Sequence, residues 1–302
     1  MENPPPGPPA LAAVVINYDS GKHLGTCLAE LSAAAGDAPG DFIVVDNAST
    51  DDSLSAAKDH SEVQVIQNPK NVGYGTACNE GFRTTAAPFV CFLNPDVVPA
   101  PGSLSAMASA MAERPEVGVL GPRLNNPDGS RYPSCRVVPS LSVAVGHAVL
   151  GLLTPNNRFT RAYQLLDGDH AAEQEVDWVS GAAMMVRREA FEQVGGFDES
   201  YFMYVEDVDL CSRLRHAGWK AVYFPEAQMM HHVAGSSRRT PYKMIFHHHR
   251  SLLRYALSRT RGIKRLALPL IVAGLVLRML LVWLVFLLRH GRKAHRASIH
   301  MG

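Results

Sequence analysis

Short apolar runs recur along the first 122 residues, and segments with helical character separate them. Each run is almost continuously hydrophobic, which is typical of strands that helices cover on both faces. Strands of this kind that alternate with helices predict an α/β fold, Rossmann-like, whose sheet is mostly parallel. The expected strands span residues 11–17, 41–46, 62–68, 88–94 and 116–122.

The alternation breaks after residue 122. A turn-rich loop and an irregular stretch at 139–175 follow, and a strand and a helix return within 176–199. Residues 201–219 then have the apolar spacing of an amphipathic helix, and a further strand runs into a loop with two histidines. We expect residues 12–240 to form one domain, preceded by a proline-rich disordered tail at residues 1–11.

Composition narrows the class of protein. The chain has 302 residues, of which 47% are hydrophobic and 19% charged, and a formal net charge of +1. These values indicate a globular protein, and the first 230 residues lack the basic stripe that would favour nucleic acid as a partner. The five cysteines are scattered without a CxxC pair, which argues against a disulfide framework and a zinc site. Because the N-terminus lacks the basic segment and apolar core of a signal peptide, we expect a cytosolic location.

Polar side chains follow the expected strands where each strand ends. The carboxyl ends of parallel strands meet at one edge of a sheet, and ligands of such sheets bind there. We therefore expect these side chains to face one cleft. The first, second and fourth strands contribute Asn17, Tyr18 and Asp19, then Asp46 and Asn47, then Asn94 and Asp96.

The segment "FLNPDVV" interrupts a buried strand with Asn94, Pro95 and Asp96. Proline cannot donate to a ladder, so the strand ends near Leu93 and Asp96 projects from a turn at its carboxyl edge. An aspartate that caps its own turn is the plain alternative. The loop "NPKNVGYGTACNEGF" adds Asn71, Gly73 and Asn79 at a helix start, where small residues allow a ligand to approach the backbone.

Two further groups carry candidate chemistry. Glu206, Asp207 and Asp209 lie within four residues, either as an acidic first turn that complements a helix dipole or as functional carboxylates. His231 and His232 lie at a strand end, and with Asp96 one of them would complete an oxygen and nitrogen site for a divalent ion.

The order of these pieces resembles the family 2 inverting glycosyltransferases, which have the GT-A fold. The matching segments are "VVINYDS", "IVVDNASTDDS", "NVGYGTACNEGF", "FLNPDV", "GAAMMVRREAFEQVGGFDESYFMYVEDVDLCSRLRHAGW" and "HHVAGSS", in the same order across residues 12–237. The resemblance implies that Asp207 is the general base. It implies nucleotide-sugar contacts at Asn17, Tyr18, Asp46, Asn47, Asn71, Gly73, Asn79 and Asn94, and acceptor contacts at Trp178, Gly181 and Glu206.

The resemblance also implies a metal, Mg²⁺ or Mn²⁺, held by Asp96. Many relatives have two acids where this chain has Asn94, Pro95 and Asp96. A single carboxylate makes a histidine ligand more plausible, and His232 is preferred to His231 because "HVAGSS" has the family's His-x-x-Gly-x-Ser pattern.

Residues 266–288 form an almost wholly apolar stretch within an expected helical region at 241–302. The stretch is long enough to span a bilayer, but Arg278 at its centre costs about 3 kcal/mol on insertion scales. The basic flanks attract anionic lipid. We therefore expect peripheral association with the cytoplasmic face of the cell membrane rather than a crossing. A core helix, or one that pairs two copies in a homo-oligomer, is the alternative.

A membrane-seeking tail on a sugar transferase suggests a lipid-linked acceptor. The segment "NNPDGSRYPSCR" and the aromatic turn before Glu206 resemble the subgroup that transfers L-rhamnose from dTDP-L-rhamnose to N-acetylglucosaminyl-diphospho-polyprenol in cell-wall linker synthesis. A galactofuranosyl- or mannosyltransferase with the same machinery is the nearest alternative. A nucleotide-sugar-binding scaffold without turnover is an alternative of another class, and it would be expected to lack a base at Asp207.

Overall fold

The computed structural model describes residues 9–137, 171–233, 241–260 and 262–299, together with short pieces at 143, 150, 154, 156–163 and 165. One mixed sheet dominates the structure, with its strands in the order β3-β2-β1-β4-β10-β6-β11-β5 and β8 paired to β11. The strands are β1 (Leu11–Asn17), β2 (Gly40–Asp46), β3 (Val63–Gln67), β4 (Phe89–Leu93), β5 (Val97–Pro99), β6 (Val117–Asn125), β8 (Gln174–Val176), β10 (Ala183–Arg187) and β11 (Lys220–His231).

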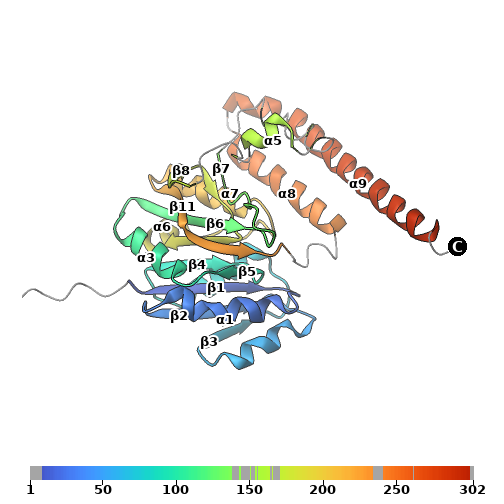
Figure 1. Cartoon of the computed structure of the whole chain (residues 1–302). Helices are drawn as coiled ribbons and strands as arrows, with labels where there is room; N and C mark the ends of the chain where they lie inside the picture. Colours follow the sequence, from blue (N-terminus) through green and yellow to red (C-terminus); the bar gives the residue numbers. More distant parts are fainter. Residues whose placement is uncertain are drawn as a thin grey trace, which may run out of the picture.

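The α/β prediction is confirmed, and Figure 1 shows the sheet between its helical layers. Pairs among the first four strands are parallel, whereas β10 runs antiparallel between β4 and β6. The helices near the sheet are α1 (His23–Ala35), α2 (Tyr74–Arg83), α3 (Ser103–Ala112), α6 (Arg188–Gln193) and α7 (Glu206–His216), with a 3-10 helix η1 (Asp52–Asp59). Helix α5 (Arg158–Tyr163) lies farther from the sheet (Figure 1).

Strand β1 explains why the strands read as continuous apolar runs. Its residues alternate between two cores, so that Ala13 and Val15 pack with α1 and α3, while Val14 packs with α2 and α7. Both faces of the strand are therefore buried. This burial fixes the register in which Asn17 lies opposite Asp46, and it brings the polar strand ends together.

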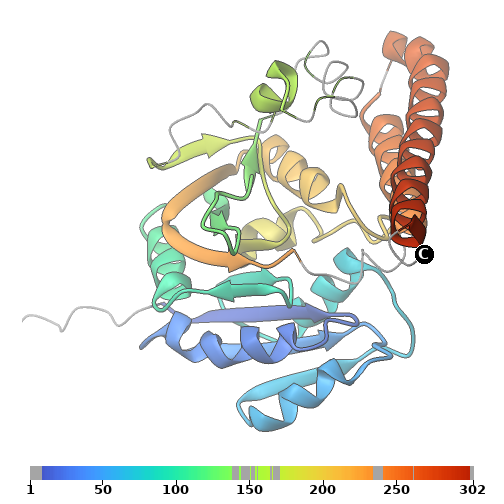
Figure 2. The same cartoon turned by 45° about the vertical axis from the view of Figure 1, so that its right-hand side comes forward.

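The last part of the chain forms helices α8 (Pro241–Arg259) and α9 (Leu268–Ile299), joined through a 3-10 helix η3 (Gly262–Ala267). Figures 1 and 2 show these helices side by side at one flank of the sheet domain. Helix α8 is tied to that domain, because Ser251 Oγ donates to the Met203 carbonyl at 2.9 Å and Arg254 pairs with Asp198 at 3.3 Å. The predicted domain boundary at residue 240 stays a prediction.

Residues Arg265–Leu287 form a helical segment long and apolar enough to cross a membrane, with a mean hydropathy of 2.7. Its large side chains are exposed along one side, and none of its most apolar window is buried within the protein. The segment therefore fits a membrane-associating tail. The exposed side chains here include Leu266, Leu270, Val276, Leu277, Leu280, Leu281, Leu284 and Leu287.

Candidate active site

The ends of β1 and β2 share a closed network of polar side chains. Asn17 is fully buried and donates to Asp46 Oδ1 at 2.8 Å and to the hydroxyls of Ser49 and Ser53 at 3.1 and 2.9 Å. Ser20 donates in turn to the Asn17 amide oxygen. Because these bonds use the whole Asn17 amide, its place in the structure is beneath Asp46, which it orients, rather than on the cleft surface. Tyr18, by contrast, is exposed.

Asn47 anchors the loop before α2. Its amide donates to the Gly73 carbonyl at 3.1 Å, and its side-chain oxygen accepts from the Val72 N–H at 3.0 Å. Asn71 accepts from the Gly73 N–H at 3.0 Å. Gly73 has a φ of +92°, and a Cβ there would lie 2.5 Å from the Phe202 carbonyl oxygen. Only glycine fits this close approach of the two loops.

Asn79 lies within α2, and Asn94 directly follows β4. Asn79 on α2 is buried, exchanges hydrogen bonds with the backbone of Phe197, and donates to Glu199 at 3.0 Å. It therefore pins the turn that precedes α7 and presents no free polar group to a donor. Asn94 follows β4, and its side chain lines the large cavity described below.

Asp96 lies beside His231, not beside the ring of His232. The antiparallel pairing of β5 with β11 puts His231 opposite Val97, and its Nε2 lies 3.4 Å from Asp96 Oδ1. His232 reaches Asp96 only through its backbone N–H, which donates to the Asp96 carbonyl at 2.9 Å, while its ring packs 5.5 Å from that of His23. The preference for His232 is thus not supported, because the strand register turns its neighbour inward.

Asp96 and His231 fit a divalent ion as a pair of oxygen and nitrogen donors. Both side chains are buried, and His231 Nδ1 has no hydrogen-bond partner among the described residues. Within the same part of the chain, no group of three or more His, Cys, Asp or Glu side chains is arranged to hold a metal. Any ion here would need oxygen ligands from a substrate or from water.

Asp207 sits in the first turn of α7, where the helix dipole favours a negative charge. Its Oδ2 accepts from the Gly181 N–H at 2.9 Å, and its Oδ1 from the Val208 N–H at 2.8 Å. Tyr74 donates from its hydroxyl to the Gly181 carbonyl and so holds this loop from the other side. A Cβ at residue 181 would lie in van der Waals contact with Asp207, 3.4 Å from its Cβ.

Glu206 is buried next to Asp207, and its Oε2 has no hydrogen-bond partner in the described part of the chain. Burial raises the pKa of both carboxyls, and the neighbouring Asp207 adds to the rise at Glu206, whose pKa reaches about 8. The N–H groups of Gly181 and Val208 oppose the rise at Asp207. We therefore assign the charge of the pair to Asp207 and the proton to Glu206.

The backbone before this pair is strained. Tyr204 and Val205 have φ values of +66° and +72°, which non-glycine residues rarely adopt, least of all a β-branched one. Such strain persists where the surroundings fix it and is common at functional sites. Asp209, the third acid of the cluster, is paired with Arg213 at 2.6 Å and Arg259 at 3.2 Å. Its carboxylate is therefore structural.

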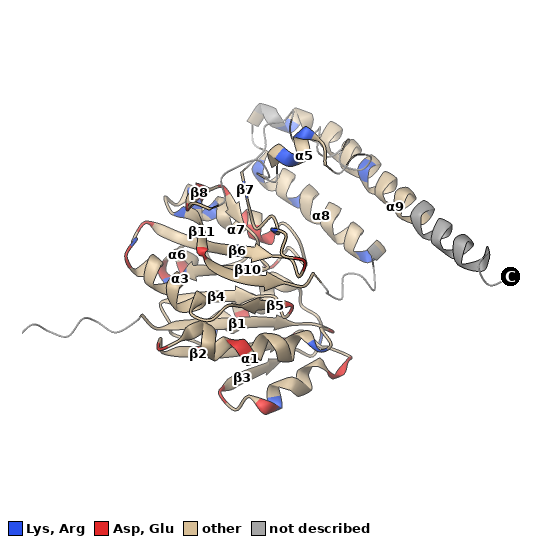
Figure 3. Ribbon diagram, viewed as in Figure 1, with Lys and Arg blue, Asp and Glu red and all other residues tan. Residues whose placement is uncertain are grey.

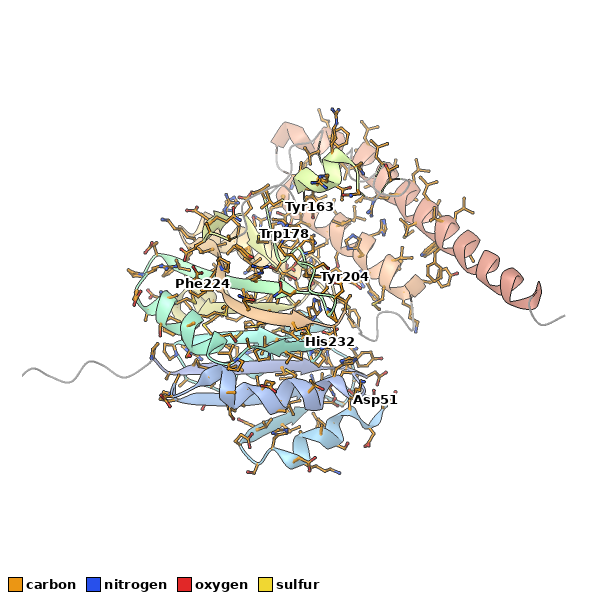
Figure 4. The ribbon with its side chains drawn as sticks, viewed as in Figure 1. Asp51, Tyr163, Trp178, Tyr204, Phe224 and His232 are labelled. Carbon is orange, nitrogen blue, oxygen red and sulfur yellow. The ribbon has the colours of Figure 1, made fainter. Side chains whose placement is uncertain are left out.

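A cavity of about 680 Å³ opens in front of Asp207, between the sheet domain and helices α8 and α9. Figure 4 shows Tyr163, Trp178 and Tyr204 on the flank that faces α8. A short two-stranded sheet of β7 (Cys135–Arg136) and β9 (Trp178–Val179) forms part of the wall, with the Arg136 guanidinium 4.7 Å from the Trp178 ring centre. The lining also includes Tyr132, Ser180, Leu252, Tyr255, Leu275 and Arg278.

Residues 8–252 match the family described as "Glycosyltransferase like family 2". This chain is a family 2 glycosyltransferase. The match covers the whole sheet domain and continues into α8. Its extent agrees with the hydrogen bond and ion pair that dock this helix on the sheet domain.

Two comparisons place the transferase among known proteins. It is 42% identical over 267 residues to the N-acetylglucosaminyl-diphospho-decaprenol L-rhamnosyltransferase of Mycobacterium tuberculosis, covering 83% of this chain and 85% of that one. It is 31% identical over 177 residues to the rhamnosyltransferase WbbL of Escherichia coli, covering 58% and 64% of the two chains. The predicted resemblance to the rhamnosyltransferase subgroup is therefore confirmed at the level of sequence.

A solved structure supports the fold. The mannosyltransferase of Pyrobaculum calidifontis, solved with GDP-Man and Mn²⁺, superposes with a TM-score of 0.57 at 17% identity, over 95% of this chain and 80% of that one. At this identity the likeness concerns the fold alone, and it confirms the predicted GT-A architecture.

Several residues of this transferase escaped sequence reasoning. Tyr74 and Arg136 lie in segments that the sequence singled out for other residues. Only the fold brings Tyr74 to Gly181, next to Asp207, and Arg136 to Trp178. The contribution of α8 and α9 to the cavity was also missed. One signal was available: all 28 acidic residues precede residue 227, whereas residues 241–302 carry twelve Lys or Arg and no acid. Figure 3 shows this basic helical pair.

Proposed function

We propose that this glycosyltransferase transfers L-rhamnose from dTDP-L-rhamnose to N-acetylglucosaminyl-diphospho-polyprenol, with inversion, at the cytoplasmic face of the membrane. The observation that carries the proposal is the 42% identity to the mycobacterial rhamnosyltransferase over 85% of its length. The cavity between the sheet domain and the apolar α9 supports it, because a lipid-linked sugar needs a site that is reached from the membrane side.

Asp207 is the proposed general base. Its two backbone donors and the helix dipole keep the carboxylate charged, and its position in the cavity wall lets it accept the proton of an acceptor hydroxyl. As that oxygen attacks the anomeric carbon, the bond to the nucleotide diphosphate breaks on the opposite face, which gives inversion. Glu206, protonated beside it, is proposed to donate a hydrogen bond to the acceptor or to the loop.

The donor is proposed to bind across the ends of β1, β2 and β4. Asp46 is held by Asn17 for contact with the base or ribose, and exposed Tyr18 flanks the same edge. Asp96 and His231 are the residues proposed to hold Mg²⁺ or Mn²⁺, which would neutralise charge on the departing diphosphate. Asn47 and Asn71 are proposed to shape the loop of Gly73 around the donor.

Product detection by mass spectrometry tests this proposal. The full-length protein in detergent would be incubated with a short-chain polyprenyl-diphospho-N-acetylglucosamine and, separately, with dTDP-L-rhamnose, UDP-galactofuranose or GDP-mannose. We expect transfer from dTDP-L-rhamnose at a rate at least about tenfold above the others, and loss of transfer when a chelator removes divalent ions. A preferred donor other than dTDP-L-rhamnose would overturn the assignment of the sugar.

A further inference from the structure

Two arginines from opposite walls line the cavity in front of Asp207. Arg136 comes from β7, in the sheet domain, and Arg278 comes from the middle of α9. Tyr163 lies next to both, with the Arg136 guanidinium 5.2 Å from its ring centre and an electrostatic interaction with Arg278. Arg278 is the charge that interrupts the apolar tail, and the structure turns it away from the exposed leucines.

Neither arginine is in ion-pair contact with an acid of the described residues, although Arg136 lies within electrostatic range of Asp207. Among the described residues no carboxylate forms an ion pair with Arg136 or Arg278, and the Nε of each is buried without a hydrogen-bond partner. The acids in the cavity wall are Glu206 and Asp207. Two half-buried guanidinium groups whose buried Nε atoms have no hydrogen-bond partner among the described residues are costly, so this arrangement indicates that an anion completes the site.

Histidines from α8 orient Arg278 without neutralising it. His249 Nδ1 lies 2.7 Å from the Ile245 carbonyl, which assigns the proton to that nitrogen, and its Nε2 then accepts from Arg278 Nη1 at 3.1 Å. Burial and Arg278 lower the pKa of the adjacent His248 to about 3, so this ring is also neutral. The neutral His249 ring thus orients the Arg278 guanidinium without cancelling its positive charge.

We propose that Arg136 and Arg278 form the binding subsite for the diphosphate of the lipid-linked acceptor. The proposal rests on the proposed function. It fits the geometry, because Arg136 is an electrostatic neighbour of Asp207, where the acceptor sugar reacts, while Arg278 lies on the helix whose other side carries the exposed leucines. A sugar, a diphosphate and a hydrocarbon chain would then lie in sequence from Asp207 toward α9.

The donor diphosphate is the other anion to consider, because His231 lines the same cavity as the two arginines. The strand ends with Asp46 and Asn47 belong to β2, which lies at the end of the sheet away from α8 and α9 in Figures 1 and 2. Asp96 precedes β5 and His231 ends β11, and these two residues are proposed to supply the donor diphosphate with its ion. A guanidinium group can donate two parallel hydrogen bonds to phosphate oxygens, whereas a lysine ammonium group cannot. A lysine would therefore replace either arginine only in part.

Binding and kinetics of Arg278→Gln in the full-length protein test the subsite. We expect its affinity for farnesyl diphosphate to fall by at least about tenfold while affinity for dTDP stays within twofold. In transfer, KM for a farnesyl-diphospho-N-acetylglucosamine should rise by a similar factor, with transfer to octyl N-acetylglucosaminide unchanged. Arg278→Lys should recover part of the loss, and Arg265→Gln, at an exposed arginine in η3, is the matched control.

The outcomes separate this subsite from the proposed function. If the wild type binds farnesyl diphosphate tightly, loses it in Arg278→Gln, yet makes no product from any N-acetylglucosamine acceptor, the subsite stands and the proposed function fails. If the wild type binds farnesyl diphosphate no better than farnesol, or inorganic diphosphate competes equally in both variants, the subsite is overturned. Equal losses on both acceptors, or a loss of dTDP affinity, would also overturn it.

Discussion

The carboxyl ends of β1 and β2 and the helix pair α8–α9 treat buried polar groups in opposite ways. At the ends of β1 and β2, Asn17 and Asp46 satisfy each other and the neighbouring hydroxyls within a closed network. On α8 and α9, buried polar atoms of His247, Arg278 and Trp283 have no partner among the described residues. A closed network orients side chains before a ligand arrives, whereas unmatched groups indicate that a ligand or a lipid surface completes the structure.

Net charge also differs between the first 240 residues and the C-terminal region that contains α8 and α9. The first 240 residues hold 17 basic and 28 acidic residues, a net charge of −11, against +12 in the remaining 62. The overall value of +1 therefore conceals two regions of opposite sign. The basic region faces anionic lipid and a diphosphate in the proposed function, and its α8 is held to the sheet domain by Arg254 and Arg259, which pair with Asp198 and Asp209.

The largest expected effect comes from the sheet domain. Asp207→Asn keeps the shape of the side chain and removes its basicity, so kcat should fall by at least about 10² while the dissociation constant of the donor stays within a few fold. Single-turnover kinetics and donor titration on the same preparation measure both quantities. Glu206→Gln serves as the matched control, with an expected loss of less than about tenfold. The reverse order of the two losses would show that the base is Glu206.

Removing residues 262–302 tests the role of α9 in membrane binding and in the use of a lipid-linked acceptor. The truncation deletes η3 and α9, and with them the exposed leucines and part of the cavity wall, while keeping all of the family match. We expect release from liposomes, and transfer to a polyprenyl-diphosphate acceptor to fall by at least about tenfold, with transfer to octyl N-acetylglucosaminide retained. Flotation of the truncated protein with liposomes would contradict the role of α9.

The sequence predicted the strand ends well and the walls of the cavity poorly. Runs such as residues 11–17 and 88–94 are buried on both faces, so that local pattern and tertiary burial agree, and the residues after them fall at one edge. The walls of the cavity depend on strand pairings between residues far apart in the sequence. Strand β10 enters the sheet antiparallel, and β7 pairs with β9. The register of β5 against β11 places His231, rather than His232, next to Asp96. No local pattern records such pairings.

Gly73 allows a test of how closely the loop before α2 packs against the backbone of Phe202. Gly73→Ala places a Cβ 2.5 Å from the Phe202 carbonyl oxygen at a φ of +92°, so we expect a loss of about 2–4 kcal/mol in the free energy of unfolding. Gly129→Ala is the matched control, because its φ of +81° imposes a similar backbone strain while no atom lies within 4 Å of the new Cβ. Denaturant unfolding of both variants gives the difference. Equal losses would mean that the loop moves aside without cost.

The smallest expected effect concerns the proton that Glu206 holds. Its pKa is raised from 4.5 to about 8, so between these values the folded state binds a proton that the unfolded state has released. The stability that goes with the neutral carboxyl is fully present below about pH 4.5 and is lost as the pH rises from there through about 8, so this residue makes stability fall with rising pH. Glu206→Gln cannot titrate, and thermal unfolding from pH 5 to 8 should show a decline in Tm that is smaller than in the wild type by at least about 3 °C. The result separates the two carboxyls of the pair: if Asp207→Asn flattens the profile and Glu206→Gln does not, the proton resides on Asp207, and the carboxylate that remains to accept the acceptor's proton is Glu206.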